Sequence, residues 1–222
     1  MSSVKLIAKT VPVIDGLSTA EELISYAARV SNPGNQLNTG TSSKLLAYCM
    51  KKKHWSIFEQ VDLTFEIRTT RDIGRQILRH KSFSFQEFSQ RYAVVETSDF
   101  ELREARLQDA KNRQASLETD DQVLAYGWKV WQDKVAQTAS HAYSWALHNG
   151  IAKEQARVVL PEGMTQSVMY MKGNLRSWIH YIEVRSGDDT QKEHRLIALE
   201  IKSKLMEEFE FLGALWKQTG EI

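Results

Sequence analysis

The stretch 61–69, VDLTFEIRT, alternates strictly between apolar and polar residues. Successive side chains of a β-strand point to opposite faces of a sheet, so this alternation predicts a strand with one buried and one solvated face. Less regular strand patterns are present at 4–10, 91–95 and 165–171. Any fold of this chain must therefore provide a sheet with a covered apolar face.

Helical patterns outnumber the strand patterns. Apolar residues recur at helical spacing in 18–30, 43–53, 71–80, 120–149, 152–159, 174–185 and 190–212. Ser18 and Glu21 predict a capping box at the first helix, and Gly150 is suited to the left-handed backbone after the long fourth one. Strands and helices do not alternate in a βαβ rhythm, which favours an α+β fold. We expect 81–90 to be irregular and the charged segment 100–118 to be an extended excursion or a mobile loop.

The charge balance argues against a broad nucleic-acid surface. The 222 residues include 29 Lys and Arg against 28 Asp and Glu, so any anion site must be a local cluster. Cys49, the single cysteine, excludes an internal disulfide and a cysteine-based zinc site. No apolar run approaches the ~20 residues that span a membrane, and the first ten residues lack the apolar core of a signal peptide. We expect a cytoplasmic protein, in the host cytoplasm if the gene is viral, with no metal and no membrane or nucleic-acid partner.

The segment 79–91, RHKSFSFQEFSQR, carries the densest chemistry. It follows a predicted helix on which Arg71, Arg75 and Arg79 share one stripe. Such a stripe is most often a solvated basic face, and a nearby anionic ligand is the alternative. The residues that follow interleave hydroxyls and amides with three phenylalanines and end at Arg91. This combination favours a phosphorylated, planar ligand.

The same segment resembles the signature of the flavin-dependent thymidylate synthases, the ThyX family. That signature is Arg-His-Arg, seven residues, then Ser, with a closing Arg two residues later. Arg79 and His80 match it, and Lys81 replaces the third basic residue. Gln86 stands where the family often has Asn. The other positions at the expected spacing are Ser84, Glu87, Ser89 and Arg91.

Further segments agree with the family in order along the chain. They are Ala-Arg-Val-Ser at 28–31, His-Trp-Ser-Ile-Phe-Glu at 54–59, Ala-Arg-Val-Val-Leu-Pro at 156–161 and Asn-Leu-Arg-Ser at 174–177. The family's Arg-x-x-x-His-Ala-Gln ending would run from Arg185 to Gln191, but Asp189 and Thr190 replace its His and Ala. The resemblance covers about residues 28–191.

The resemblance implies a fold, a reaction and an assembly. The fold would be one domain over 1–222, with a central, mostly antiparallel sheet flanked by helices. The reaction would convert dUMP to dTMP, with FAD as cofactor, NADPH as reductant, 5,10-methylenetetrahydrofolate as carbon donor and no metal. The assembly would be a homotetramer whose active sites are shared between subunits.

The resemblance also assigns roles to residues. Arg185 lies on the apolar stripe of the helix 174–185, where by itself it is either a snorkelling side chain or a buried ligand contact. The resemblance makes Arg185 the catalytic residue, a cation held against the uracil ring. The implied dUMP contacts are Gln76, Arg79, Glu87, Ser89, Arg91, Arg157 and Arg185. The implied FAD contacts are Ser31, Ser56, Arg79, His80, Lys81, Glu87, Asn174, Arg176 and His180, with His54 in the folate or flavin vicinity.

Two side chains could suggest a covalent mechanism. Ser89 has no base or oxyanion hole that the sequence reveals, which favours binding over nucleophilic attack. Cys49 could be activated by the neighbouring lysines 51–53, but a lone helical cysteine is more often a small core residue. We therefore expect no protein nucleophile. His141, His148 and His194 lie on predicted long helices and receive no role.

Two other function classes stay open. The departures at Lys81, Gln86 and Asp189 are compatible with a non-catalytic flavin- or nucleotide-binding protein on the same scaffold. A helical RNA-binding protein could use the arginine stripe and lysines 51–53, although the near-neutral charge disfavours it.

Overall fold

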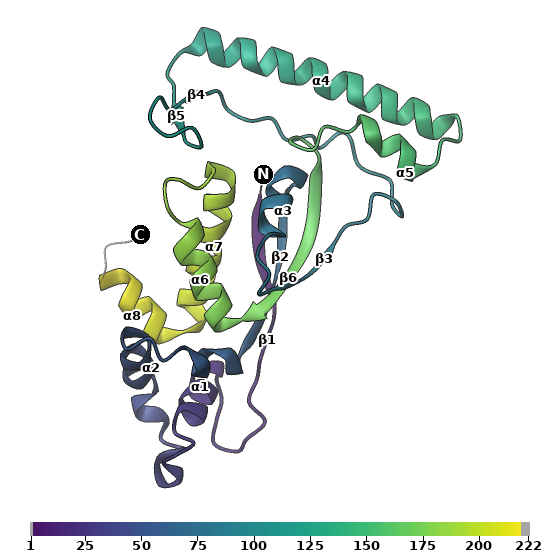
Figure 1. Cartoon of the computed structure of the whole chain (residues 1–222). Coiled ribbons are helices and arrows are strands. Elements are labelled where there is room, and N and C mark those ends of the chain that lie inside the picture. Colours follow the sequence, from purple (N-terminus) through teal and green to yellow (C-terminus); the bar gives the residue numbers. More distant parts are fainter. Residues whose placement is uncertain (1, 219–222) are drawn as a thin grey trace.

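The computed structural model describes residues 2–218. Its centre is a four-stranded sheet in which every pairing is antiparallel. In spatial order the strands are β1 (Ser3–Lys9), β2 (Asp62–Thr70), β6 (Gln166–Asn174) and β3 (Ser84–Glu87). Helices flank the sheet, and one long helix crosses one end of the molecule (Figure 1). The predicted α+β class and antiparallel sheet are confirmed.

Strand β2 shows how the alternating sequence becomes a core. Its apolar residues are buried, while Arg68 on the other face is exposed. Phe65 is fully buried and packs edge-on against Trp178, with ring centroids 4.8 Å apart. The indole N–H of Trp178 donates to the carbonyl oxygens of Leu63 and Gly173, at 3.3 and 3.0 Å. Burial of these rings fixes the helix that carries Trp178 against the sheet.

The helices form two groups. Those that share the main apolar core with the sheet are α1 (Ala20–Ala28), α2 (Ser42–Lys51), α3 (Arg71–Ile77), α6 (Leu175–Arg185), α7 (Lys192–Glu208) and α8 (Glu210–Gln218). A smaller apolar cluster joins α4 (Gln122–His148) and α5 (Lys153–Ala156) to the chain around Val95. Within residues 2–218 the short 3-10 helices are η1 (Pro33–Asn35), η2 (Thr39–Thr41), η3 (Trp55–Gln60) and η4 (Arg157–Val159).

Strand β6 continues into α6 with no connecting residue. Asn174 ends the strand and is also the N-cap of the helix, where its side-chain oxygen accepts from the N–H of Ser177 at 2.9 Å. Nearby, the ring of Phe83 occupies the space that a side chain at Gly173 would need, since an added Cβ would lie 2.4 Å from it. This close approach seats the turn between α3 and β3 on the sheet.

The excursion 100–118 contains the small hairpin of β4 (Arg106–Gln108) and β5 (Ser116–Glu118). Ion pairs connect it to the start of α7. Arg106 pairs with Glu193, and Lys192 lies 2.8 Å from Glu104 and 2.7 Å from Glu118. The charged residues that obscure any hydrophobic periodicity in this segment therefore form the ion pairs that attach it to α7.

Two predicted elements were wrong. No strand forms at 91–95, and the strand lies instead at β3, inside the segment predicted to be irregular. Val95 is buried against α4, with its N–H donating to the hydroxyl of Tyr143 at 3.1 Å, so its apolar character serves packing rather than a ladder. The helix predicted over 190–212 is interrupted at Phe209, where φ is −130° and ψ 108°. The break lets Phe209 and Phe211 both enter the core.

The capping box of α1 lies one residue later than predicted. Thr19, not Ser18, is the N-cap: its hydroxyl accepts from the N–H of Glu22 at 3.1 Å, and the Glu22 carboxylate accepts from the N–H of Thr19 at 3.0 Å. Glu21 is buried instead. The residue at position 22 can reach the cap because it lies one turn beyond Thr19.

Replacing Thr19 by alanine is expected to lower the free energy of unfolding by about 1 kcal/mol, because an orphan helix N–H loses its acceptor. Ser18→Ala is the matched control, since the Ser18 hydroxyl does not cap the helix. Urea unfolding of both variants measures the difference. A larger loss in Ser18→Ala than in Thr19→Ala would place the cap at Ser18 instead.

Candidate functional site

The end of α3 and the end of α6 meet at Arg185. The Nε of Arg185 donates to Nε2 of His80 at 2.9 Å, across 105 positions of sequence. The His80 ring stands edge-on to Tyr181, with centroids 4.9 Å apart and an interplanar angle of 74°. Tyr181 precedes Arg185 by one helical turn. One helix thus carries both the cation and the aromatic ring that supports its partner.

His80 is a neutral acceptor at this contact. Burial, followed by the nearby Arg185 cation, lowers the pKa of His80 to about 4. Burial also lowers the pKa of His194, which lies behind Tyr181, to about 3. Near neutral pH the histidines therefore add no charge beside Arg185, and a neutral imidazole holds the guanidinium in place.

Acidification from pH 6.5 towards pH 4 is expected to destabilise the protein, because His80 and His194 bind protons in the unfolded chain but not in the folded protein. A histidine whose pKa is lowered in the folded state makes the protein less stable as pH falls below the unfolded-state pKa. The loss of stability is complete once pH is below the folded-state pKa. For the fully buried His194 the loss between pH 6.5 and pH 5 is about 2 kcal/mol. Urea unfolding at both pH values, in the wild type and His194→Asn, measures it. An equal pH dependence in the two proteins would contradict the assignment.

Several cations at this site have no carboxylate partner. Between residues 2 and 218, no ion pair engages Arg79, Lys81 or Arg185. Elsewhere Arg75 lies 2.6 Å from Glu162 and Arg103 lies 2.8 Å from Asp72. Arg79 and Lys81 are exposed, and Arg185 is half-buried. An anionic ligand would supply the charge that the chain does not.

A groove of about 770 Å³ lies beside α6 and joins three of the predicted flavin contacts, Asn174, Arg176 and His180. Glu59 faces it and forms an ion pair with Arg176. The remaining lining residues are Lys53, Trp55, Ser82, Ser177 and Glu183. Amide, guanidinium, ammonium and imidazole donors with one indole fit a phosphorylated, aromatic cofactor, and the volume is that of a ligand site.

The other predicted flavin positions lie beyond this groove. Ser56 lines a separate hollow of about 600 Å³ with residues of α1, and Ser31 follows α1 on the exposed surface. His54 is exposed and occupies the N-cap position of η3 without a capping hydrogen bond from its side chain, and its ring lies 6.4 Å from that of Tyr48. In the single chain these positions do not share one cavity with Asn174.

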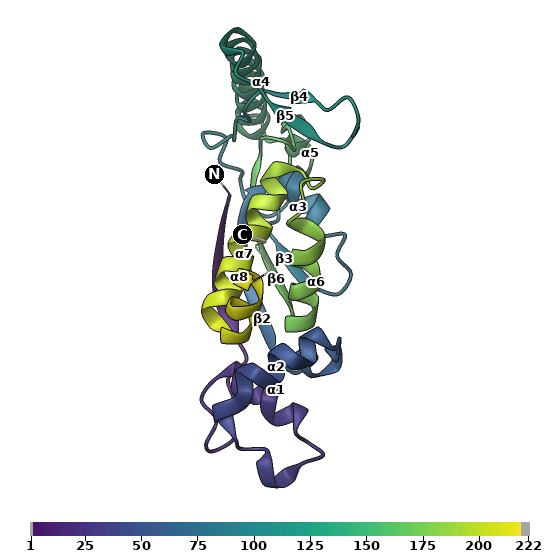
Figure 2. The same ribbon diagram turned by 90° about the vertical axis from the view of Figure 1, so that its left-hand side faces the viewer.

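The predicted nucleotide contacts are also dispersed. Arg91 lies 3.4 Å from the carboxylate of Glu154, and Nε of Arg157 donates to the Glu154 carbonyl oxygen at 3.3 Å. Ser89 lies two residues before Arg91 and is exposed. This group is located near α5, at the end of the molecule opposite α1 in both views (Figures 1 and 2). Gln76 instead lies on α3, close to His80.

Glu87 has two partners that the sequence patterns did not identify. Its Oε1 accepts from the hydroxyl of Ser167 at 2.9 Å and lies 3.3 Å from Nη1 of Arg71. The Arg71 Nη1 atom is buried and makes no hydrogen bond. The arginine stripe includes Arg71, but the sequence pattern could not distinguish a buried ion pair from a solvated basic face at this position. The partner of Arg71 comes from a strand 16 residues away.

A second omission is His194, which is fully buried and lies 2.9 Å from the Tyr181 hydroxyl and 3.3 Å from the Gln76 oxygen. Its position three residues before Ile197 and four before Ala198, on the apolar face of α7, was a signal. A histidine on such a face is either a packed structural ring or part of a buried polar network.

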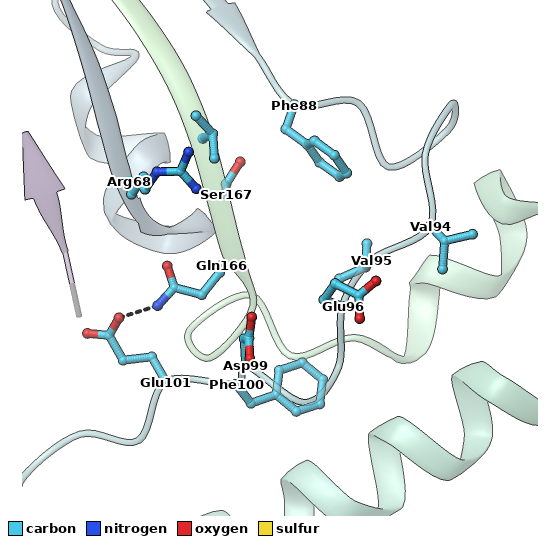
Figure 3. Close-up of a pocket in the computed structure, with 11 residues that line it drawn as sticks. Arg68, Phe88, Val94, Val95, Glu96, Asp99, Phe100, Glu101, Gln166 and Ser167 are labelled. Atoms are coloured by element: carbon cyan, nitrogen blue, oxygen red, sulfur yellow. Dashed lines mark hydrogen bonds between the residues drawn. The ribbon is translucent and has the colours of Figure 1, made fainter. Parts of the chain in front are cut away.

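A further hollow of about 550 Å³ contains none of the predicted binding residues (Figure 3). Phe88, Val95 and Phe100 face it from the chain beyond β3, and Gln166 and Ser167 from β6. Within residues 2–218 no three His, Cys, Asp or Glu side chains gather as a metal site. No helix in that range is long and apolar enough to cross a membrane.

Comparison with known proteins gives one consistent result. The family model described as "Thymidylate synthase complementing protein" matches residues 12–209. A probable flavin-dependent thymidylate synthase of Paramecium bursaria Chlorella virus 1 is 52% identical over 211 residues, covering 93% of this chain and 95% of the viral one. The flavin-dependent thymidylate synthase of Synechocystis is 50% identical over 214 residues, covering 95% and 97%.

The fold is also similar to that of a solved methylase. The crystal structure of the UMP/dUMP methylase PolB from Streptomyces cacaoi, bound with 5-Br dUMP, superposes with a TM-score of 0.82 at 26% identity, covering 100% of this chain and 97% of the other. Sequence and fold therefore agree, and the family match spans nearly all of the described residues. The chain belongs to the flavin-dependent thymidylate synthases, a family of methyltransferase enzymes.

Proposed function

We propose that this enzyme converts dUMP to dTMP, with FAD as cofactor, 5,10-methylenetetrahydrofolate as carbon donor and NADPH as reductant. The observation that carries the proposal is the Arg185–His80 contact, which holds a cation without a carboxylate partner. The two residues lie two positions along the chain from Glu183 and Ser82, which line the proposed cofactor groove. The names of the relatives and the 5-Br dUMP bound to the methylase support the substrate. Family membership also favours this activity over a non-catalytic binding protein.

The proposed cofactor residues would bind FAD through side chains. Arg176 and His180 would face it from α6 and Asn174 from the N-cap of that helix, with Arg79, His80 and Lys81 in the turn after α3. Glu87, Ser31 and Ser56 would complete the contacts, with His54 near the flavin or the folate. When bound, the flavin supplies the hydride that reduces the transferred carbon to a methyl group.

The proposed role of Arg185 is electrostatic. Its guanidinium would stabilise negative charge on the uracil ring as C5 becomes nucleophilic, and His80 keeps it oriented without neutralising it. Gln76, Arg79, Glu87, Ser89, Arg91 and Arg157 would hold the rest of dUMP. A preorganised cation acts more strongly than one that must first move into place.

The structure favours a mechanism without a protein nucleophile. Cys49 is buried in the main core, and burial raises the pKa of its thiol, so little thiolate is available. Ser89 is exposed, and within residues 2–218 no histidine or carboxylate hydrogen-bonds to its hydroxyl. Activation through Arg185 therefore needs no covalent bond to the chain.

We propose a homotetramer of one-domain subunits, located in the cytoplasm, with shared active sites. The residues proposed for one site lie near α1, beside α6 and near α5, which are well separated in a single chain (Figures 1 and 2). Helix α4 offers a surface for assembly, because four of its exposed apolar residues follow a coiled-coil spacing. They are Leu124, Trp128, Trp131 and Val135.

The test is an absorption spectrum of the purified protein, recorded without oxygen after addition of NADPH, with and without dUMP. Flavin bands that bleach, and bleach differently with dUMP, would support a reducible cofactor linked to the nucleotide site. Addition of 5,10-methylenetetrahydrofolate should then yield dTMP. A protein that takes up no FAD, or a reduced flavin that gives no dTMP with both substrates present, would contradict the proposal.

A further inference from the structure

His194 is a buried polar side chain that the proposed mechanism does not use. It is 0% exposed and lies on the inward face of α7. Burying an imidazole is unfavourable unless its nitrogens find partners, and both do. Nε2 lies 2.9 Å from the hydroxyl of Tyr181 on α6, and Nδ1 lies 3.3 Å from Oε1 of Gln76 on α3. The ring thus links three helices at the site.

The hydrogen bonds around Gln76 define where the protons lie. Gln76 donates through Nε2 to Oε1 of Gln191 at 2.7 Å, which leaves its own Oε1 facing His194. A carbonyl oxygen can only accept, so Nδ1 of His194 carries the proton. Nε2 is then unprotonated, because the ring is neutral, and it accepts from the Tyr181 hydroxyl.

The hydrogen bonds beyond Gln191 are donated in the same direction along the chain of side chains. Its Nε2 donates to Oε2 of Glu193 at 2.9 Å, and Glu193 pairs with Arg106. A carboxylate can only accept, so the chain of donors ends there and cannot easily reverse. The orientation of the Gln76 amide is consequently set from both sides.

This orientation limits what Gln76 can offer to a ligand. Its oxygen is engaged by His194, and one amide hydrogen is engaged by Gln191. The second amide hydrogen stays available as a donor. A donor at this place recognises an acceptor oxygen, whether a pyrimidine carbonyl or a phosphate oxygen, and discriminates against a ring N–H.

We infer that His194 is a positioning residue of the nucleotide site, which acts through Gln76 to present an amide N–H to an acceptor oxygen of the nucleotide. The inference rests on the proposed function, since it assigns Gln76 to dUMP. His194 also holds the hydroxyl of Tyr181, whose ring supports His80. His194 therefore orients the amide of Gln76 that would contact the nucleotide. Through Tyr181 it also supports His80, the partner of Arg185.

The experiment measures the dissociation constant of dUMP by equilibrium dialysis on the flavin-loaded protein, with kcat and both KM values. His194→Leu removes both hydrogen bonds at similar volume and should weaken dUMP binding about 5- to 30-fold, the loss expected for 1–2 kcal/mol. The KM for the folate should change little. His194→Asn keeps an N–H near the position of Nδ1 and should restore most of the affinity.

A double-mutant cycle separates positioning from general support of the fold. In a Gln76→Ala background, His194→Leu should cause little further loss of dUMP affinity, because the amide that it orients is gone. Tyr181→Phe, which deletes only a hydroxyl, should weaken dUMP binding in the same direction and gives the test a variant that perturbs folding least. Losses that add in the cycle, or a His194→Asn variant as weak as His194→Leu, would overturn the inference. A wild-type protein that binds no dUMP would instead overturn the proposed function.

Discussion

Arg185→Ala is expected to lower kcat about 10²- to 10³-fold, the effect of removing one preorganised charge from a developing anion. The fold should persist, because Arg185 is half-buried at the end of α6 and makes no ion pair within residues 2–218. Arg185→Lys should recover part of the rate, since it keeps the charge but loses the planar fork and the Nε that contacts His80.

Arg75→Ala is the matched control for this variant. Arg75 lies on α3 near the same site, but it is exposed and paired with the exposed Glu162, so its loss should alter kcat only a few-fold. Single-turnover rates at saturating dUMP measure the chemical step. An Arg185→Ala enzyme that keeps its kcat but binds dUMP more weakly would show that Arg185 holds the substrate without activating it.

The second large effect is expected from a disrupted assembly. Replacing Trp131 and Val135 by glutamate places two charges on the exposed apolar stripe of α4, and burying them between subunits would cost several kcal/mol. Because tenfold corresponds to 1.4 kcal/mol, activity should fall below about 1% of the wild type at the same concentration. Sedimentation should show smaller species than the tetramer proposed for the wild type.

Gln137→Glu with Ser144→Glu adds the same charge to another exposed face of α4 and should leave both assembly and activity intact. An active monomer, whether variant or wild type, would contradict shared active sites. A tetramer that persists in the Trp131 and Val135 double variant would place the contact elsewhere on the chain.

Local patterns were sufficient for most elements of the fold. The alternation at 61–69 predicted β2, and Gly150, with φ at 78°, follows the long helix as expected. The error at 91–95 arose because two valines look alike in a strand and in a loop that packs on a helix. Val95 is buried by Tyr143, 48 residues away, and local sequence does not encode that contact.

The same limit applies to the candidate site. The sequence motifs assigned His80 and Arg185, and the structure brings them within 2.9 Å. His194 received no role because its meaning depends on Tyr181 and Gln76, which three-dimensional packing supplies. Short-range periodicity shows which face of a helix is apolar, but it does not show which polar side chains of other elements hydrogen-bond to a residue on that face.

The direct junction of β6 and α6 limits how this chain can vary in length. Asn174 belongs to both elements, so the pairing of β6 with β2 determines where the helix starts and which way its side chains point. One inserted residue in 166–174 would flip the strand's alternation or rotate the helix by about 100°, turning His180 and Arg185 away from their partners. We expect insertions in relatives to collect in the hairpin turn at 109–115, where no such phase is kept.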